Sequence, residues 1–328
     1  MESITKNRQP QDVLRAMVTR AYGADAVPDG EGWCEELGQG WFNVAYRIRL
    51  RDGRQVVLKI APPAGVEVMT YERDLMANEV HALTLVRERT TVPVPAVHHH
   101  DTSHDLCDAD WFFMEYVDAE NLGVVRAELP PEQRRGYTEA LGAVNRELNR
   151  IPGDHFGPLR SGSPERTWRQ VFMGILEEVL QDGERRQVDI GRDYDLVRTL
   201  IEERADCLDE VTDPVFVEWD LWDGNVMIRD GAIVGIIDHE RALYGDPLME
   251  SGFAPTELAA FGDPGPFLRG YGKAPLTPAE RERRRLYNLH LMLIMVIETV
   301  FRGFAAPAHF DWTRARLDEV LAGFDPPR

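Results

Sequence analysis

Three carboxylates and one amide lie close together in EWDLWDGN, residues 218–225, and a further aspartate, Asp238, ends a later apolar run. Clustered acids cost free energy unless a proton or a cation offsets their charge. Carboxylate and amide oxygens suit Mg²⁺, which proteins hold with one or two carboxylates, water and substrate phosphates. The pattern therefore indicates a magnesium site at Asn225 and Asp238, with Asp220 left to accept a proton from an attacking hydroxyl.

The residues between Asn225 and Asp238 predict a β-hairpin that brings these two side chains together. The apolar runs VMI and AIVGII flank Asp230-Gly231, a pair typical of a two-residue turn. Such a turn places residue 225 opposite residue 236 and leaves Asp238 at the open end of the hairpin. Taken alone, the pattern also fits a polar hairpin with solvated acids, so other parts of the chain must supply the remaining chemistry.

Two glycines near the N-terminus have the geometry to approach phosphates. The stretch ELGQGWFNVAY places Gly38 and Gly40 between two predicted strands, where backbone amides can lie against phosphate oxygens. Asn43 stands near the place of a third glycine, and asparagine adopts left-handed backbone more readily than most residues. A pair of glycines is more often an ordinary turn, so this feature gains weight only together with its neighbours.

A lysine and a glutamate follow the glycines in the order that phosphate binding needs. Lys59 ends the apolar run VVLK and is flanked by Leu58 and Ile60, an unusual setting for a surface lysine. Glu79 lies on the apolar side of the next predicted helix, so we expect it to pair with Lys59 and hold it against phosphates. Glu72 is the alternative partner.

The predicted elements place these residues in two separate parts of the chain. Residues 33–60 indicate three strands, and the apolar spacing in 70–89 predicts a helix of about five turns. A buried strand follows and ends near Asp118, where polar residues take over. The rest is mainly helical, over residues 131–210 and from 277 onward, with a single hairpin between these regions.

This order predicts an α+β, bilobal architecture. The small β-rich N-terminal lobe comprises residues 1–117, and the larger, mainly helical C-terminal lobe comprises residues 118–328. A site formed by residues from both lobes would lie in the cleft between them. The first 23 residues lack the apolar core of an export signal and instead predict an amphipathic helix.

The order of these parts along the chain resembles the aminoglycoside phosphotransferase family, within the protein-kinase-like fold that also includes choline kinases. The matching segments are LGQGWFNVAYRI, VVLK, Glu79, WDLWDGNVMI and IIDHERALYGDP. The segment FFMEYV resembles the hinge between the lobes of that fold. The resemblance covers roughly residues 33–250, which is most of the chain.

The resemblance implies in-line transfer of the γ-phosphoryl group of ATP or GTP to a small-molecule hydroxyl acceptor, with Mg²⁺ as cofactor. Asp220 would be the catalytic residue, and Asn225 and Asp238 would hold the metal. The donor nucleotide would be bound by residues of the glycine turn, the following strand and helix, and the hinge: Gly38, Gly40, Asn43, Lys59, Glu79, Glu115 and Val117.

Three residues depart from the pattern of the family. Glu218 stands where a histidine is usual in the catalytic loop, and His239 replaces an aromatic residue after the metal aspartate. Asn149 replaces a histidine before the FG pair at 156–157. The catalytic-loop histidine is a scaffold rather than a proton carrier, so Glu218 is not expected to abolish the chemistry. A catalytically impaired, nucleotide-binding pseudokinase stays an alternative.

Charge and cysteine content argue against several other classes of protein. The formal net charge of -19 disfavours a partner nucleic acid or membrane and fits a cationic small molecule. The most apolar stretch, residues 286–301, is too short and too polar to span a membrane. The 3 cysteines are widely spaced and odd in number, which favours a reducing compartment, the cytoplasm, over a disulfide framework.

The acceptor is the least determined part of the prediction. An aminoglycoside, macrolide, peptide or nucleoside antibiotic is the leading candidate, with a role in resistance; a choline- or sugar-type metabolite and a non-catalytic nucleotide sensor are the alternatives. Arginines are numerous in the helices expected to shape the acceptor site, but so are acids that suit an amine: Glu177, Glu178, Asp182 and Glu298. The histidine-rich stretch 98–104 is interpreted as a solvated loop, and we expect a monomer or homodimer.

Overall fold

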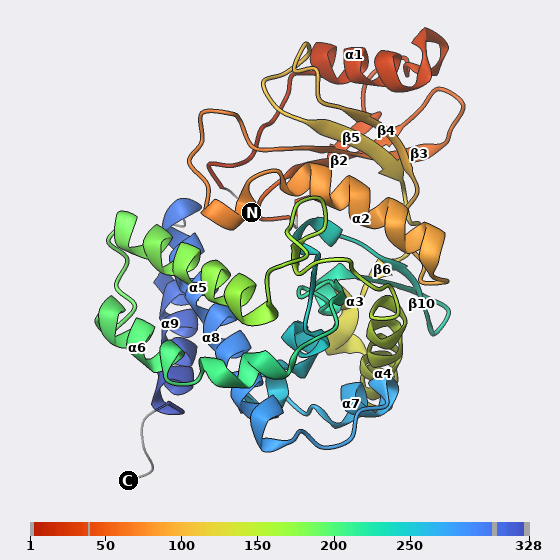
Figure 1. Cartoon of the computed structure of the whole chain (residues 1–328). Coiled ribbons are helices and arrows are strands. Elements are labelled where there is room, and N and C mark those ends of the chain that lie inside the picture. Colours follow the sequence, from red (N-terminus) through yellow and green to blue (C-terminus); the bar gives the residue numbers. More distant parts are fainter. Residues whose placement is uncertain (1–2, 39, 304–306, 325–328) are drawn as a thin grey trace.

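The computed structural model of the chain describes residues 3–38, 40–303 and 307–324. Figure 1 shows a sheet-containing N-terminal part above a mainly helical part that includes the C-terminal helices. Within those ranges, no helix is both long and apolar enough to cross a membrane. The predicted α+β organisation is confirmed, and the lobe boundary between residues 117 and 118 stays a prediction.

A five-stranded antiparallel sheet forms the N-terminal part, with its strands in the order β1-β2-β3-β5-β4. The strands are β1 (Cys34–Glu36), β2 (Val44–Arg49), β3 (Gln55–Ile60), β4 (Val97–Asp101) and β5 (Trp111–Glu115). Because β3 is the central strand, it is buried from Val56 to Ile60. Lys59 therefore leaves the sheet from a rigid position, with β2 on one side and β5 on the other.

Two helices cover the two faces of this sheet, as Figure 1 shows. Helix α1 (Gln11–Tyr22), predicted from the amphipathic N-terminus, packs on the face that contains Leu58. Helix α2 (Leu75–Arg89) packs on the face that contains the adjacent Val57. Successive side chains of a strand point to opposite faces, so both faces of the sheet have an apolar core.

The helix predicted over residues 70–89 begins later than expected. Residues Thr70–Glu72 form a short 3-10 turn, and Asp74 has left-handed backbone with φ 60°. Helix α2 then starts at Leu75. Apolar spacing could not predict this break, because a single left-handed residue changes the direction of the chain without changing its hydrophobic pattern.

The histidine-rich stretch 98–104 is partly a strand rather than a loop. His98, His99 and His100 lie in β4, at the edge of the sheet next to β5. The ring of His98 hydrogen-bonds to the hydroxyl of Tyr22 in α1 at 2.8 Å. Among the described residues, the only group of acids, histidines or cysteines close enough to share a metal ion lies elsewhere. These contacts support a structural role for the stretch.

Helices make up most of the C-terminal part. They are α3 (Leu122–Val125), α4 (Pro131–Leu148), α5 (Trp168–Arg185), α6 (Tyr194–Glu202), α7 (Gly265–Tyr271), α8 (Pro278–Phe301) and α9 (Pro307–Ala322). Helix α8 is buried on most of its sides, which explains the long apolar stretch at residues 286–301. This helix forms the central core of the C-terminal part.

Two small sheets fix the segments that surround the predicted hairpin. The first joins β6 (Glu120–Asn121), β9 (Val226–Arg229) and β10 (Ala232–Ile236) in the order β10-β9-β6. The second joins β7 (Gly157–Pro158), β11 (Leu243–Gly245) and β8 (Val215–Val217) in the order β7-β11-β8. The predicted hairpin is confirmed as β9 and β10. The additional strands of two or three residues were not predicted, because they are too short to show an alternating pattern.

Candidate active site

The hairpin of β9 and β10 carries Asn225 and Asp238 at its open end, but its register differs from the prediction. Val226, rather than Asn225, pairs with Ile236, because β10 bulges at Val234. A two-residue turn fixes the register only as far as the first bulge, which inserts one extra residue into its strand. The bulge brings Asp238 one position closer to Asn225 than the simple hairpin would.

A buried glutamate holds the loop that follows β8, residues 218–225, which is the predicted catalytic loop. The carboxylate of Glu250 accepts hydrogen bonds from the backbone N–H groups of Trp219, at 3.0 Å, and Leu221, at 2.8 Å. Asp220, between them, accepts a hydrogen bond at its carbonyl from the side-chain amide of Asn225 at 2.9 Å. Trp219 itself has left-handed backbone, with φ 48°. Glu250 is not predicted from the sequence, because it lies in a separate segment beyond β11.

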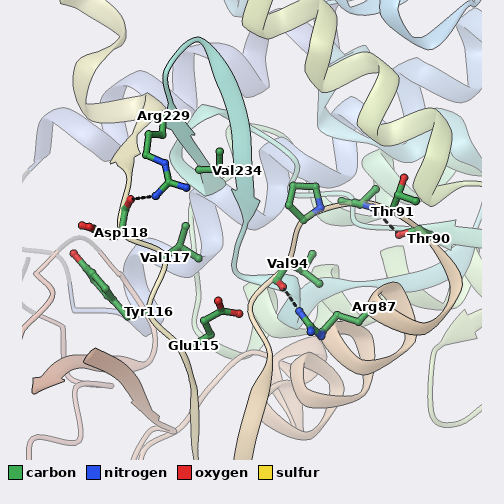
Figure 2. Close-up of a pocket in the computed structure, with 12 residues that line it drawn as sticks. Arg87, Thr90, Thr91, Val94, Glu115, Tyr116, Val117, Asp118, Arg229 and Val234 are labelled. Atoms are coloured by element: carbon green, nitrogen blue, oxygen red, sulfur yellow. Dashed lines mark hydrogen bonds between the residues drawn. The ribbon is translucent and has the colours of Figure 1, made fainter. Parts of the chain in front are cut away.

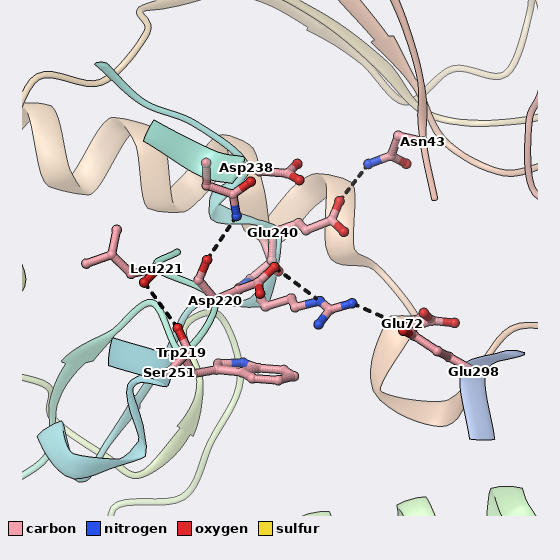
Figure 3. Close-up of polar contacts among 12 residues, drawn as sticks. Asn43, Glu72, Trp219, Asp220, Leu221, Asp238, Glu240, Ser251 and Glu298 are labelled. Carbon is pink, nitrogen blue, oxygen red and sulfur yellow. Dashed lines mark hydrogen bonds and ion pairs between the residues drawn. The ribbon is translucent and has the colours of Figure 1, made fainter. Parts of the chain in front are cut away.

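The environment of Asp220 makes its carboxylate a stronger base than an ordinary aspartate. Burial raises the pKa of Asp220 to about 7, although the positive charge of Arg241 opposes this shift. The Nε atom of Arg241 lies 3.9 Å from the Asp220 carboxylate. Its guanidinium carbon lies 5.5 Å from the ring centroid of Tyr71 and 5.1 Å from that of Trp219. Figure 3 shows Asp220 beside this network, in which Arg241 also lies 3.6 Å from the carboxylate of Glu298.

Lys59 connects the sheet, the helix and the hairpin. Its ammonium donates hydrogen bonds to Glu79 and to Asp238, both at 2.6 Å. Lys59 thus lies against Glu79, the preferred partner in the sequence analysis, whereas Glu72 pairs with Arg302 instead. Both carboxylates raise the pKa of Lys59 against the opposing effect of burial, so the amine is charged at neutral pH.

A third carboxylate, Glu240, joins the predicted metal-binding region. Carboxylate oxygens of Glu79, Asp238 and Glu240 all lie within 4.8 Å of one another. One oxygen of the buried Glu79 has no hydrogen-bond partner, and burial raises the pKa of Glu240 well above its ordinary value. This set of hard oxygen donors fits Mg²⁺. Glu240 is not among the metal ligands predicted from the sequence, although its position two residues after Asp238 indicates a further acid near the site.

The glycine turn contacts the segment after β10 through Asn43. Neither Gly38 nor Asn43 has a positive φ angle, so the expectation that Asn43 is tolerated for its left-handed backbone is wrong. Asn43 instead donates a hydrogen bond from its side chain to Glu240 at 2.6 Å, as Figure 3 shows. This bond links the turn between β1 and β2 directly to the segment that carries Asp238 and Glu240, two of the predicted metal ligands.

The hinge residues Glu115 and Val117 line a pocket of about 510 Å³, shown in Figure 2. Its other walls are residues 90–94, which follow α2, and the β9–β10 hairpin at Arg229 and Val234. The Glu115 carboxylate faces the segment after α2 and accepts from its backbone at Ala96. None of the residues that line this pocket belongs to β1, β2 or β3.

The two unusual residues Glu218 and His239 are in direct contact. The Nδ1 atom of His239 lies 2.5 Å from the Glu218 carboxylate, and both side chains are buried. The Nε2 atom donates to the carbonyl of Ile236 at 3.2 Å. The pair joins the start of the catalytic loop to the residue that follows Asp238. Glu218 and His239 both depart from the pattern of the family, but their contact was not predicted from the sequence.

Known proteins resemble this chain in sequence over different lengths. Residues 33–287 match the model of the phosphotransferase enzyme family. A subtelomeric hrmA-associated cluster protein of Aspergillus fumigatus is 27% identical over 115 residues, which are 34% of this chain and 22% of that protein. The chain therefore spans about a fifth of the length of the curated relatives that it matches.

Several solved structures share the fold over nearly the whole chain. A candidate fructosamine-3-kinase from Thermobifida fusca is 23% identical with a TM-score of 0.64, covering 94% of this chain and 98% of that one. The aminoglycoside phosphotransferase APH(4)-Ia, in complex with AMP-PNP and hygromycin B, is 17% identical with a TM-score of 0.64 and the same coverage. APH(2″)-IIIa with GDP and kanamycin is 17% identical with a TM-score of 0.65, again over 94% and 98%.

Proposed function

The chain belongs to the phosphotransferase enzyme family, and from this premise we propose that it transfers the γ-phosphoryl group of ATP or GTP to a hydroxyl of a small-molecule antibiotic. The observation that carries the proposal is the environment of Asp220. Burial raises its pKa to about 7. The positive charge of Arg241 lowers this pKa, and the negative charge of Asp238 raises it. A carboxylate with a pKa near the working pH is well suited to take a proton from a hydroxyl.

The acceptor side of the reaction depends on the catalytic loop. Asp220 orients the acceptor hydroxyl and takes its proton as the oxygen attacks phosphorus. Glu250 keeps the loop in place through the backbone of Trp219 and Leu221. Arg241 holds the Asp220 carboxylate near the reacting group. Positioned groups of this kind lower the activation barrier because they need no reorganisation during the reaction.

The donor side depends on residues from both parts of the fold. Lys59 binds phosphates that are not transferred, and Glu79 keeps its ammonium in place. Asp238, Asn225 and Glu240 would hold Mg²⁺, which when bound neutralises charge on the phosphates. The glycine turn lies over the phosphates, and the hinge backbone contacts the base.

A neutral sugar-type metabolite is the second candidate acceptor, because most acids that suited an amine already have cationic partners. These ion pairs join Arg198 with Glu177, Arg185 with Asp182 and Arg241 with Glu298. Among the proteins of similar fold, the candidate fructosamine-3-kinase has a name that also points to a sugar-type acceptor, although a fructosamine carries an amine. An antibiotic acceptor would imply a role in resistance. The free cysteines fit a reducing compartment such as the cytoplasm, and we propose a monomer or homodimer.

The test is a transfer screen with γ-labelled ATP and GTP, with and without Mg²⁺. Its acceptors are aminoglycoside, macrolide, peptide and nucleoside antibiotics on one side, and choline, sugars and fructosamines on the other. We expect Mg²⁺-dependent labelling of one acceptor class. Labelling of the metabolite class alone would replace the antibiotic assignment, and labelling of neither class would contradict the proposed function.

Asp220→Asn is the matching variant for the screen. It should reduce transfer at least about 100-fold, because a general base is lost, while ATP affinity stays within about twofold. Asp223→Asn is the control, since Asp223 lies in the same loop but pairs with Arg126 at 3.0 Å. Full turnover by Asp220→Asn would contradict the assigned role of Asp220.

A further inference from the structure

Residues 3–8, the N-terminal segment, lie against the glycine turn. The hydroxyl of Thr5 donates to the carbonyl of Phe42 at 2.8 Å, and the ammonium of Lys6 donates to the carbonyl of Asn43 at 2.6 Å. Arg8 pairs with Glu36 of β1 at 2.7 Å. Thr5 and Lys6 are buried by these contacts. The segment therefore holds a lysine side chain beside the turn expected to cover the phosphates.

Lysine is rare in this chain, which makes its positions informative. Of the 37 lysines and arginines, only three are lysines: Lys6, Lys59 and Lys273. Arginine therefore supplies nearly every surface cation and ion pair. Two of the lysines, Lys6 and Lys59, are only 9% and 7% exposed and lie near the same site. A lysine ammonium is a compact point charge that approaches phosphate oxygens without the planar geometry that arginine requires.

Lys6 differs from the other two lysines in its partners. Lys59 pairs with Glu79 and Asp238, and Lys273 pairs with Glu280 at 2.7 Å. Within the described part of the chain, the Lys6 ammonium has one hydrogen bond, to a carbonyl, and no carboxylate within 4.0 Å. The charge of Glu36 acts on Lys6, but the Glu36 carboxylate pairs with Arg8. A buried cation without a carboxylate in direct contact costs free energy, which an anionic ligand would offset.

The position of Lys6 indicates which ligand that would be. A Cβ atom built on Gly40 would lie 3.5 Å from the Lys6 ammonium, so the amine lies directly beside the glycine turn. Burial lowers the pKa of Lys6, and Asp238 and Lys59 are close enough for their charges to act on it as well. Asn43, whose carbonyl accepts from Lys6, donates from its side chain to Glu240, so Lys6 is connected through one residue to the predicted metal ligands.

We propose that Lys6 is a second phosphate-binding lysine, which the N-terminal segment brings to the nucleotide site to bind the triphosphate of the donor together with Lys59. The proposal rests on the proposed function, since it needs a nucleotide donor. An ammonium has three N–H donors, of which the carbonyl of Asn43 occupies one, so the phosphate oxygens can accept from the others. Binding of the triphosphate would give this buried ammonium an anionic partner in direct contact.

The test compares ATP, ADP and adenosine binding by calorimetry in the absence of any acceptor. Lys6→Met preserves the length of the side chain and removes its charge, so ATP affinity should fall about tenfold, ADP affinity should fall less, and adenosine affinity should not change. Lys6→Arg, which keeps the charge, should lose less ATP affinity than Lys6→Met. Lys273→Met is the matched control and should bind all three ligands as the wild type does.

Three results would overturn the proposal. Unchanged ATP affinity in Lys6→Met would remove Lys6 from the site while leaving the proposed function intact. An equal loss for ATP and adenosine, or an equal loss in Lys6→Arg and Lys6→Met, would show that the residue only supports the turn. Failure of the wild-type protein to bind any of the three ligands would overturn both the Lys6 proposal and the proposed function.

Discussion

At the scale of single residues, Glu218 and His239 show how one unusual side chain can compensate for another. The carbonyl of Ile236 can only accept, so Nε2 of His239 carries a proton, and one further proton is shared between Nδ1 and Glu218. Burial raises the pKa of Glu218, and Glu218 in turn raises the pKa of His239 against the effect of burial. The pair is neutral overall and connects the catalytic loop to the segment of Asp238.

Removal of either partner should destabilise the fold. Glu218→Leu leaves His239 without its carboxylate, and His239→Leu leaves Glu218 without its donor, so each should lower the free energy of unfolding by about 3 kcal/mol. The double variant removes both polar groups and should lose at least about 1 kcal/mol less than the sum of the single losses. Chemical denaturation measures these values, and strictly additive losses would count against a coupled pair.

Asp238 accepts a hydrogen bond from the Lys59 ammonium and is also a proposed ligand of Mg²⁺. Asp238→Asn keeps the shape of the side chain but weakens its interactions with Lys59 and with Mg²⁺. In this variant Mg²⁺ should therefore no longer increase the thermal stabilisation by ATP. For the wild type, ligand at about 100 times its Kd should add about 2.7 kcal/mol of stability. Thermal unfolding with ATP, with and without Mg²⁺, measures the difference. Asp223→Asn should behave as the wild type, and a normal Mg²⁺ effect in Asp238→Asn would remove Asp238 from the metal site.

At the scale of elements, close packing of α4 against α7 supports the hairpin of the site. Helix α4 also contacts β8 and β10, the strands before the catalytic loop and before Asp238. Its glycine at position 142 allows a close approach, since a Cβ there would lie 2.2 Å from the carbonyl oxygen of Phe267 in α7. A Cβ on Gly270 of α7 would likewise lie 1.7 Å from the carbonyl oxygen of Glu139 in α4. Neither helix can therefore accept a larger residue at the crossing without moving.

Gly142→Ala should thus destabilise the protein, although alanine favours a helix more than glycine does. We expect a loss of about 1–3 kcal/mol, because overpacking must displace α7. Gly136→Ala is the matched control on the same helix: Gly136 is exposed and nothing lies within 4 Å of its added Cβ, so the substitution should be neutral or stabilising by up to about 1 kcal/mol. Equal effects of the two substitutions in denaturation experiments would contradict the packing argument.

At the scale of the whole molecule, α8 brings distant aromatic residues together behind the catalytic loop. His290, near the middle of this helix, lies against Trp219 of the loop and Phe172 of α5, with ring centroids 5.2 and 5.7 Å apart. Burial, with a smaller contribution from Arg241, lowers the pKa of His290 to about 3. The ring is therefore neutral in the folded protein at neutral pH.

This neutral histidine makes stability depend on pH. The folded-state pKa of about 3 is below the ordinary value of 6.5, so between these values the unfolded chain binds a proton that the folded protein does not. Stability should therefore fall as the pH is lowered from 6.5 toward 3. Between pH 7 and pH 5, His290 should account for a loss of about 2 kcal/mol.

His290→Phe keeps a ring of similar size and removes the titrating group, so its stability loss between pH 7 and pH 5 should be smaller than that of the wild type by this amount. His81→Asn, an exposed position on α2, is the control and should retain the wild-type pH dependence. Denaturant unfolding at the two pH values measures the difference. An identical pH dependence in His290→Phe would contradict the assignment to His290.

The architecture was predictable because its signals are local or periodic. The α+β organisation, the protein-kinase-like fold and the family membership expected from the sequence are confirmed. Helix α1 and strand β3 follow directly from spacing and from an apolar run. The left-handed Asp74 and the bulge at Val234 were not predictable, because each changes backbone direction or register by a single residue that leaves the hydrophobic pattern intact.

The sequence by itself determined which chemistry is available: a lysine, a glutamate and a group of acids in an order that suits phosphate transfer. Only the tertiary structure decided which side chains meet, because contacts such as Asn43 with Glu240 and Lys6 with the glycine turn join segments that are far apart in the chain. Glu250 is a further example, since its role depends on backbone N–H groups of a distant loop. A residue's type limits what it can bind, but burial and neighbouring charges fix its protonation and its partner.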